Sequence, residues 1–455
     1  MNQKSAPGVK RNLTEGSVGR HLVNLTLPMI WGVFAVIGFT VADTYFVGQL
    51  GTKPLAAMSF TFPVVMGLGN LAMGLGVGAS SVIALAIGTG DRHKVQRLTS
   101  DSLTLSLITV GLFVILGLAT INPLFTLLGA PPDLLPLIRD YMQIWYIGIV
   151  FVVVPMVGNS ALRAAGNTKA PSIIMTVAGG MNIILDPLLI FGWGPFPRME
   201  IQGAALTTVI SQAITLVAAV VFLHYSEGMI SWQIPRFKEV IVSWKSILHV
   251  GLPAAAANMV VPVSVGFITN AISSYGKEAV AGFGIASRVE SFALIVFIAL
   301  GSIIGPFVGQ NWGANKRDRV HQALKLSCIF CLIWGCVNAA IIATFAPQIA
   351  AAFDRNPEVI AIGATYLKFV PISYAGSGII LIASATFNAL GKPLPSVAIT
   401  VIRTIVLYIP LAYLGSWLFG LHGIFAATCF ANIAVGIGSF IWTQKTCNLS
   451  LFPGP

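Results

Sequence analysis

The sequence predicts an all-α integral membrane protein with twelve transmembrane helices in two six-helix lobes. Of the 455 residues, 56% are apolar and only 9% are charged, whereas about 25% of the residues of a soluble domain are charged. Apolar runs of about 20 residues, long enough to cross a bilayer as helices, recur along the whole chain. The second half of the chain also repeats landmarks of the first half.

Segments rich in glycine, proline and charge separate the predicted spans. The first apolar run follows a polar, basic stretch and is too long for a cleaved signal, so we expect it to serve as an uncleaved targeting helix. The runs are too long and too uniformly apolar for the strands of a membrane β-barrel. The spans cover residues 22–48, 56–87, 101–128, 139–163, 172–194, 203–225, 248–274, 284–310, 324–350, 360–387, 396–419 and 423–443.

The basic residues orient these spans. With the N-terminus placed in the cytoplasm, the inner segments and span ends hold 18 of the 26 Lys and Arg residues, and the outer side holds five. Because cytoplasmic loops carry the excess of positive charge, both termini are expected to be cytoplasmic. The same loops account for the net charge of +11. The predicted partner of the protein is therefore the lipid bilayer and not nucleic acid.

A shift of 225 residues superimposes the two halves of the chain. The Leu-Pro pairs at 27–28 and 252–253 coincide, as do Arg92 with Arg317 and Tyr141 with Tyr366. Each half contains six spans, so both halves have the same orientation, a design common in transporters. The predicted organisation is a first lobe of residues 1–225, a cytoplasmic linker of residues 226–247 and a second lobe of residues 248–455.

Three acidic residues lie well inside predicted spans: Asp43, Asp186 and Glu290. Asp43 precedes Gly48 by five residues, and Asp186 precedes Gly192 by six. Both carboxyls are therefore expected roughly 8 Å below the outer ends of their helices, where they could share a cavity. Acidic residues inside a membrane are costly and usually functional.

Asn182 lies one helical turn before Asp186, so both side chains project from one helix face. Its amide can hydrogen-bond either form of the carboxyl group. A carboxyl group in a low dielectric binds its proton more readily than in water, which suits a proton carrier. The structural alternative is that the acids hold helices together or form buried ion pairs with Arg403 or Arg288. Glu290, two residues from Arg288, is equally compatible with a functional and an interfacial role.

The second lobe does not repeat the two acids of the first. The shift of 225 residues places Ile268 opposite Asp43 and Leu411 opposite Asp186. Proton handling is therefore predicted in the first lobe. Arg403, Tyr408 and Tyr413 of the second lobe are compatible with either packing or cavity lining.

Other chemistries lack their signatures. The chain has no Walker A sequence for ATP, and its six histidines show no metal-ligand spacing. The pair Cys328 and Cys331 lies in an apolar helix, where packing thiols are expected. The sequence thus predicts neither an enzyme nor a protein that requires a cofactor or a metal.

The chain resembles the multidrug and toxic compound extrusion (MATE) family of the MOP superfamily. The resemblance covers nearly the whole chain and is carried by VADTYFVGQLG, LRAAGNTKAP, MNIILDPLLIFG and IQGAALTTVISQ. It implies a multidrug antiporter that exports amphipathic, often cationic drugs against protons, with sodium as the alternative coupling ion. It also implies location in a bacterial inner membrane, and nothing in the sequence requires more than a monomer.

Within that family the chain is similar to the DNA-damage-inducible branch, whose ion site lies in the first lobe. The resemblance implies that Asp43, Asn182 and Asp186 couple the ion, with Tyr141 and Asn159 as polar partners. It also implies bending of the first helix, for which Gly32, Gly38 and Gly48 would leave room. Another bacterial branch uses acids in the seventh and tenth spans, and this sequence has none there.

Three rival functions remain as alternatives. A lipid-linked oligosaccharide flippase of the same superfamily would need several basic residues in its cavity, whereas only Arg288, Lys368 and Arg403 lie within spans. An intramembrane aspartyl protease would need a signature such as G-x-G-D around its acids. A channel would need a selectivity filter or a ring of charge, and the sequence shows neither.

Overall fold

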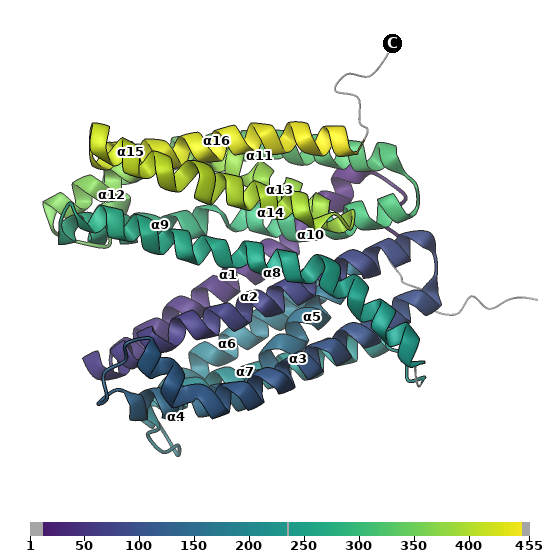
Figure 1. Cartoon of the computed structure of the whole chain (residues 1–455), viewed down its shortest axis with the longest axis horizontal. Helices are drawn as coiled ribbons and strands as arrows, with labels where there is room; N and C mark the ends of the chain where they lie inside the picture. The colour runs from purple at the N-terminus through teal and green to yellow at the C-terminus, as the bar shows by residue number, and fades with distance from the viewer. Residues whose placement is uncertain (1–11, 234–235, 448–455) are drawn as a thin grey trace, which may run out of the picture. The chain divides into compact units, whose positions relative to one another are not determined.

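The computed structural model describes residues 12–233 and 236–447, and these residues form helices and connecting turns without a β-strand. Helices satisfy their own backbone hydrogen bonds, as a chain in lipid must. The helices are α1 (Val18–Gly48), α2 (Thr52–Thr89), α3 (Arg92–Leu127), α4 (Leu135–Gly148), α5 (Val150–Ala164), α6 (Lys169–Phe191), α7 (Glu200–Val221), η1 (Phe222–Ser226), α8 (Phe237–Ser273), α9 (Lys277–Ala293), α10 (Ile295–Gly313), α11 (Arg317–Ala351), α12 (Pro357–Phe369), η2 (Val370–Ser373), α13 (Tyr374–Ala389), α14 (Pro393–Val401), η3 (Ile402–Tyr408), α15 (Ile409–Phe419) and α16 (Leu421–Thr446) (Figure 1).

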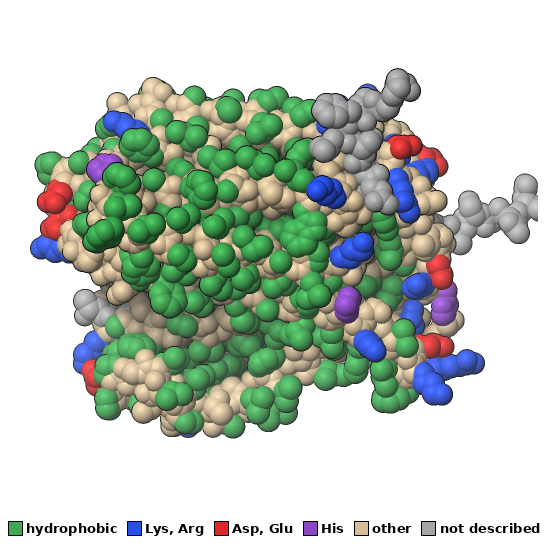
Figure 2. All heavy atoms as spheres, turned by 45° about the horizontal axis from the view of Figure 1, so that its top comes forward, with side chains coloured by type: hydrophobic (Ala, Val, Ile, Leu, Met, Phe, Trp, Pro, Cys, Tyr) green, Lys and Arg blue, Asp and Glu red, His purple; other side chains and the backbone are tan. Residues whose placement is uncertain are grey.

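The predicted membrane spans are confirmed. Among the described residues, eleven helices, some of them joined through a short η element, are long and apolar enough to cross a bilayer. Helices α4 and α5, bent by 42° at their junction, together supply a twelfth span. Large apolar side chains such as Ile115 and Ile333 stand 70% and 61% exposed, as expected where lipid is the solvent. On the face drawn in Figure 2, apolar side chains cover the middle, and charged side chains gather at its two ends.

The chain forms two compact units. Among the described residues, unit 1 contains residues 12, 27–233 and 236–255, and unit 2 contains residues 13–26 and 256–447. The segment 226–247, expected as a linker, therefore belongs to unit 1. There Gln96 on α3 donates to the carbonyl oxygen of Gly228 at 2.8 Å, and the buried Asn167 donates to Glu227 at 2.7 Å.

Two helices, α1 and α8, each contribute to both units. Residues 18–26 of α1 belong to unit 2 and the rest of α1 to unit 1, whereas α8 changes from unit 1 to unit 2 after Ala255. Both changes occur within three residues of a repeated Leu-Pro pair, Leu27-Pro28 or Leu252-Pro253. The two repeats therefore exchange the leading ends of their first helices.

Hydrogen bonds and close packing fix each exchanged end. In unit 2, Arg319 at the start of α11 donates to the carbonyl oxygens of Leu13, Glu15 and Gly16 at 2.9, 3.2 and 2.6 Å. In unit 1, α8 packs against α2 so closely that a Cβ atom on Gly74 would lie 2.5 Å from the carbonyl oxygen of Gly251. The close approach of two backbones requires glycine at that point.

Candidate functional site

Helices α1 and α6 of unit 1 pack in a register that brings their acidic residues together. A Cβ atom on Gly32 would lie 3.1 Å from the Cα atom of Ser172, and one on Gly179 would lie 3.3 Å from the carbonyl oxygen of Ala35. The Ser172 hydroxyl also donates to the Pro28 carbonyl. These contacts run in the same direction along both helices, so Asp43, further along α1, lies level with Asp186, further along α6.

The two carboxyl groups lie close enough to interact electrostatically. Asp186 is completely buried and feels the charge of Asp43. Asp43 is half-buried. Both carboxyls act on the hydroxyl of Tyr141, a buried residue of α4. The structure therefore assembles Asp43, Asp186 and Tyr141 from three helices into one polar cluster.

Several oxygen atoms in this part of unit 1 lack a donor. Oδ1 of Asp43, both carboxylate oxygens of Asp186 and Oδ1 of Asn182 are buried without a hydrogen-bond partner among the described residues. Leaving a buried acceptor unsatisfied costs about 1–3 kcal/mol, and more for a charged group. The cluster therefore has the composition of a site that is completed by protons on the carboxyl groups or by a cation.

The two predicted asparagines are both buried, at 2% exposure for Asn182 and 4% for Asn159. Asn182 lies on α6 one turn before Asp186, as its spacing predicts. Asn159 lies on α5, and its Oδ1 atom also lacks a donor. No hydrogen bond joins Asn159 to either carboxyl group among the described residues, so its place beside the acids stays a prediction.

Helix α7 supplies two residues that the sequence did not single out. Thr207 lies beside the Asp186 carboxyl group, but its hydroxyl donates to the carbonyl oxygen of Gly203 at 2.9 Å. Ser211, one turn later, is buried with an unpartnered oxygen. Their spacing of four residues in IQGAALTTVISQ was the available signal, since it places both hydroxyls on one helix face.

Among the described residues, Asp43 and Asp186 form no ion pair with arginine. Among the described residues, the ion pairs of Asp and Glu with Lys and Arg are Lys53–Asp133, Arg97–Asp101, Arg198–Glu200 and Lys277–Glu278. Arg403 instead interacts with Glu290, within unit 2. The structural alternative of an Asp43 or Asp186 salt bridge with Arg288 or Arg403 is therefore not what the structure contains. Within residues 12–233 and 236–447, no three His, Cys, Asp or Glu side chains come together as a metal site would require.

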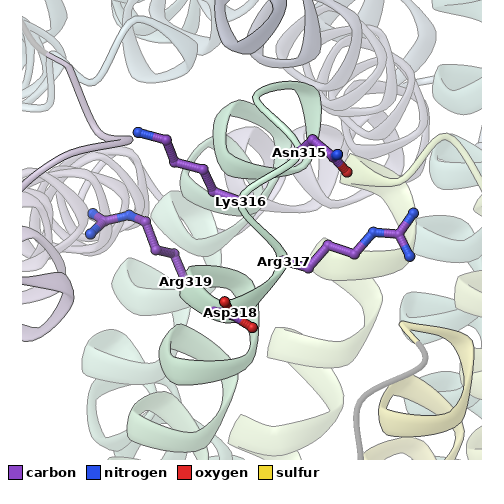
Figure 3. Close-up of a pocket in the computed structure, with 5 residues that line it drawn as sticks. All are labelled: Asn315, Lys316, Arg317, Asp318 and Arg319. Atoms are coloured by element: carbon purple, nitrogen blue, oxygen red, sulfur yellow. The ribbon is translucent and has the colours of Figure 1, made fainter.

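An open pocket of about 600 Å³ lies in unit 2, at the turn between α10 and α11 (Figure 3). Residues 315–319 line it, and Lys316 and Arg319 point to the same side of the turn while Arg317 points to the other. Lys316 and Arg319 hold the segment that precedes α1. Arg317 lies over the ring of Trp312, 5.0 Å from its centroid. Lys316 and Arg319 thus anchor a backbone segment, so these two residues of the pocket have a structural role.

The family model described as MatE matches residues 28–188 and 253–414, one match in each repeat. A protein of Shewanella oneidensis named FAD transporter is 39% identical over 96% of this chain and 97% of its own length. The probable multidrug resistance protein YoeA of Bacillus subtilis is 26% identical, with 98% of both chains covered.

Solved structures agree with these sequence matches. The MATE transporter VcmN of Vibrio cholerae, crystallised in the bent form, is 30% identical and superimposes with a TM-score of 0.89 over 95% of this chain and 97% of its own. An outward-facing multidrug resistance transporter of the MATE family is 27% identical, with a TM-score of 0.91 over 98% of this chain and 99% of its own. The repeated twelve-span fold, the match in both repeats and these relatives agree: the chain belongs to the MATE family of membrane transporters.

Proposed function

We propose that this protein is a secondary antiporter that exports amphipathic small molecules, including cationic drugs, in exchange for protons carried by Asp43 and Asp186. The observation that carries this proposal is the group of buried oxygens that lack donors around these two residues. A proton on either carboxyl group turns an acceptor into a donor for its neighbours. Protonation also removes the repulsion between two adjacent negative charges.

The proposed exchange uses the charge state of this one cluster. With both carboxyl groups ionised, the cluster carries two negative charges and attracts either protons or a cationic cargo. Loading protons removes that attraction, so the cargo is released where protons are abundant, outside the cell. Asn182 and Tyr141 supply groups that can hydrogen-bond the carboxyls. Thr207 of α7 is a further polar neighbour of Asp186.

Sodium is the alternative coupling ion. Carboxylate, amide and hydroxyl oxygens are also the ligands that hard cations prefer, and Asp43, Asn182, Asp186 and Ser211 offer such oxygens. The proton is favoured because a proton can bind to a single carboxyl oxygen, whereas sodium would need several of these oxygens to converge. We propose further that the protein acts as a monomer without a cofactor in a bacterial inner membrane, with both termini in the cytoplasm.

Transport by the purified protein in proteoliposomes tests the site. An imposed pH gradient is expected to drive export of a cationic dye such as ethidium by the wild type. Asp43→Asn and Asp186→Asn should each abolish this export, since an amide cannot exchange a proton. The matched control is Asp133→Asn, an exposed carboxylate 3.8 Å from the Lys53 ammonium group, which should transport normally. Undiminished proton-driven export by both site variants would refute the assignment, and export driven by sodium at constant pH would replace the proton with sodium.

A second candidate cargo is a flavin dinucleotide. The relative named FAD transporter shares 39% identity with this chain, against 26% for YoeA, and both cover nearly the whole length. The same proton-coupled cluster would then drive export of an anionic aromatic molecule. Such a cargo needs a positive group elsewhere in the protein, because two aspartates alone would repel its phosphates.

A further inference from the structure

Unit 2 contains a second polar cluster, centred on Glu290 of α9. The hydroxyl of Tyr366 on α12 donates to Oε2 of Glu290 at 2.6 Å. Tyr366 occupies the position that the internal repeat assigns to Tyr141. Each unit therefore places the repeated tyrosine beside a carboxyl group, although the carboxyl groups come from different helices. The polar cluster of unit 1 thus has a counterpart in unit 2.

Unlike its counterpart, the cluster of unit 2 includes a cation. Arg403 interacts electrostatically with Glu290 and Tyr408. It lies in η3, where the chain follows a π-helix, a local deformation often found at functional sites. Its guanidinium group is half-buried and forms no hydrogen bond or ion pair with a described residue. The five N–H donors of this guanidinium are therefore free to bind an acceptor that the described residues do not supply.

Aromatic groups surround the two charges. Tyr366, Tyr374 and Tyr408 all interact electrostatically with Glu290. The hydroxyl of Tyr374 is completely buried and has no hydrogen-bond partner among the described residues. The ring of Tyr366 packs edge-on against Phe283 and Phe425, with centroids 5.7 and 5.0 Å apart. The cluster thus combines a guanidinium and a phenol that have no hydrogen-bond partner among the described residues with aromatic rings packed against one another.

We propose that Arg403 of unit 2 binds the phosphate group of an aromatic, nucleotide-like compound, and that Glu290 is the internal counter-charge when this compound is absent. The planar guanidinium matches the geometry of phosphate oxygens and can form two parallel hydrogen bonds with them. This inference rests on the second candidate cargo above, because it supplies the positive group that an anionic flavin requires.

Binding of a flavin series to the purified full-length protein tests the proposal. Riboflavin, FMN and FAD share one ring system and carry no, one and two phosphate groups. Quenching of flavin fluorescence, measured in nanodiscs of neutral lipid, should show that FMN and FAD bind more tightly than riboflavin. Arg403→Gln is expected to weaken FMN and FAD binding about tenfold and to leave riboflavin binding unchanged. The matched control is Arg288→Gln, an exposed arginine on α9, which should bind all three flavins normally.

Neutralising Glu290 should change the affinity for FAD in the opposite direction to neutralising Arg403. Glu290→Gln removes the negative charge that would repel a phosphate, so the affinity for FAD should rise about threefold or more. Inorganic pyrophosphate should compete with FAD for the same protein. If phosphatidylglycerol in the nanodisc displaces FAD while pyrophosphate does not, the site belongs to a lipid headgroup and the proposal is wrong.

Two further results would overturn the proposal that Arg403 binds a phosphate group. Equal affinities of the wild type for the three flavins would exclude phosphate recognition. Parallel losses of riboflavin and FAD binding in Arg403→Gln would show that Arg403 acts through packing. Ethidium export is measured on the same purified protein after reconstitution into proteoliposomes. Intact proton-driven export without phosphate discrimination refutes only this inference, whereas a failure of Asp43→Asn to affect export refutes only the proton site.

Discussion

Among single residues, Tyr141 has the most informative position. Its hydroxyl feels the charge of both Asp43 and Asp186, while its ring belongs to a buried apolar cluster that includes Ile138 and Met142. The ring and the hydroxyl can therefore be tested separately. Removing the hydroxyl leaves the packing of the ring intact and takes a hydrogen-bonding group away from the acids.

Tyr141→Phe is expected to lower proton-driven export about threefold to tenfold, because it removes a hydroxyl that can hydrogen-bond the acids during proton transfer. The melting temperature should change little, because the ring remains. Tyr146→Phe is the control, since Tyr146 is buried on the same helix and packs against Trp145. Equal export by the two variants would mean that the Tyr141 hydroxyl has no part in proton transfer.

A polar residue could be predicted as functional from the sequence only where its residue type is rare inside a membrane helix. Asp43 and Asp186 are conspicuous because charged groups are rare there, and the structure places them together as their depths predicted. Thr207 and Ser211 were not predicted as site residues, because hydroxyl side chains can hydrogen-bond to the backbone of their own helix and occur throughout membrane spans. The contact between Tyr366 and Glu290 depends on the packing of α12 against α9, which no local pattern encodes.

At the scale of helices, close packing of α1 on α6 positions the acids. A Cβ atom on Gly32 would lie only 3.1–3.2 Å from atoms of Ser172 and Met175, closer than ordinary contact, whereas nothing lies within 4 Å of a Cβ atom on Gly38. The resemblance to the family suggested that both glycines would allow bending of the first helix. The structure shows that Gly32 also permits a close contact of α1 with Ser172 and Met175 of α6, and the bending of α1 stays a prediction.

Gly32→Ala should therefore destabilise the protein by about 1–3 kcal/mol through overpacking, with a lower melting temperature in detergent. Gly38→Ala should be neutral or should stabilise by up to about 1 kcal/mol, because alanine favours a helix. Similar melting temperatures for the two variants would show that α1 and α6 can separate at no cost. If Gly38→Ala is stable but exports slowly, bending of α1 contributes to transport.

The number and order of spans followed from hydropathy, but breaks within spans did not. The predicted span 139–163 is divided between α4 and α5, with a bend of 42°. The division falls at Ile149, directly after Gly148, a weak helix former that the hydropathy pattern did not separate from the rest of the span. The break at η2 does contain Pro371, whose missing N–H weakens a helix predictably.

At the scale of the molecule, the division of α1 and α8 makes each unit depend on both halves of the sequence. Unit 2 needs residues 13–26, and unit 1 needs residues 237–255. A fragment that ends at Gly228 should therefore be less stable than one that ends at Ala255. Size-exclusion chromatography of fluorescent fusions would compare the two fragments. Equal monodispersity would contradict the assignment of the first part of α8 to unit 1.

Co-expression extends this test to the whole chain. Fragments 1–228 and 229–455 should be recovered together and poorly when expressed singly, because each carries a helix end that the other fragment requires. Recovery of either fragment alone as a monodisperse species would contradict this dependence. The control is the second fragment extended with residues 13–26 through a flexible linker, which should restore part of its yield.

The reciprocal exchange of helix ends also bears on the ancestry of the chain. Two copies of a six-helix protein that traded the first turns of their leading helices would form a swapped homodimer. Joining the genes of such a pair end to end would yield one polypeptide with two parallel repeats and with both trades preserved. The Leu-Pro pairs at 27–28 and 252–253 would then mark where each ancestral subunit crossed to its sibling. After such a gene fusion, the two copies could diverge from each other in sequence. One copy could then keep its paired aspartates, and the other could acquire an arginine.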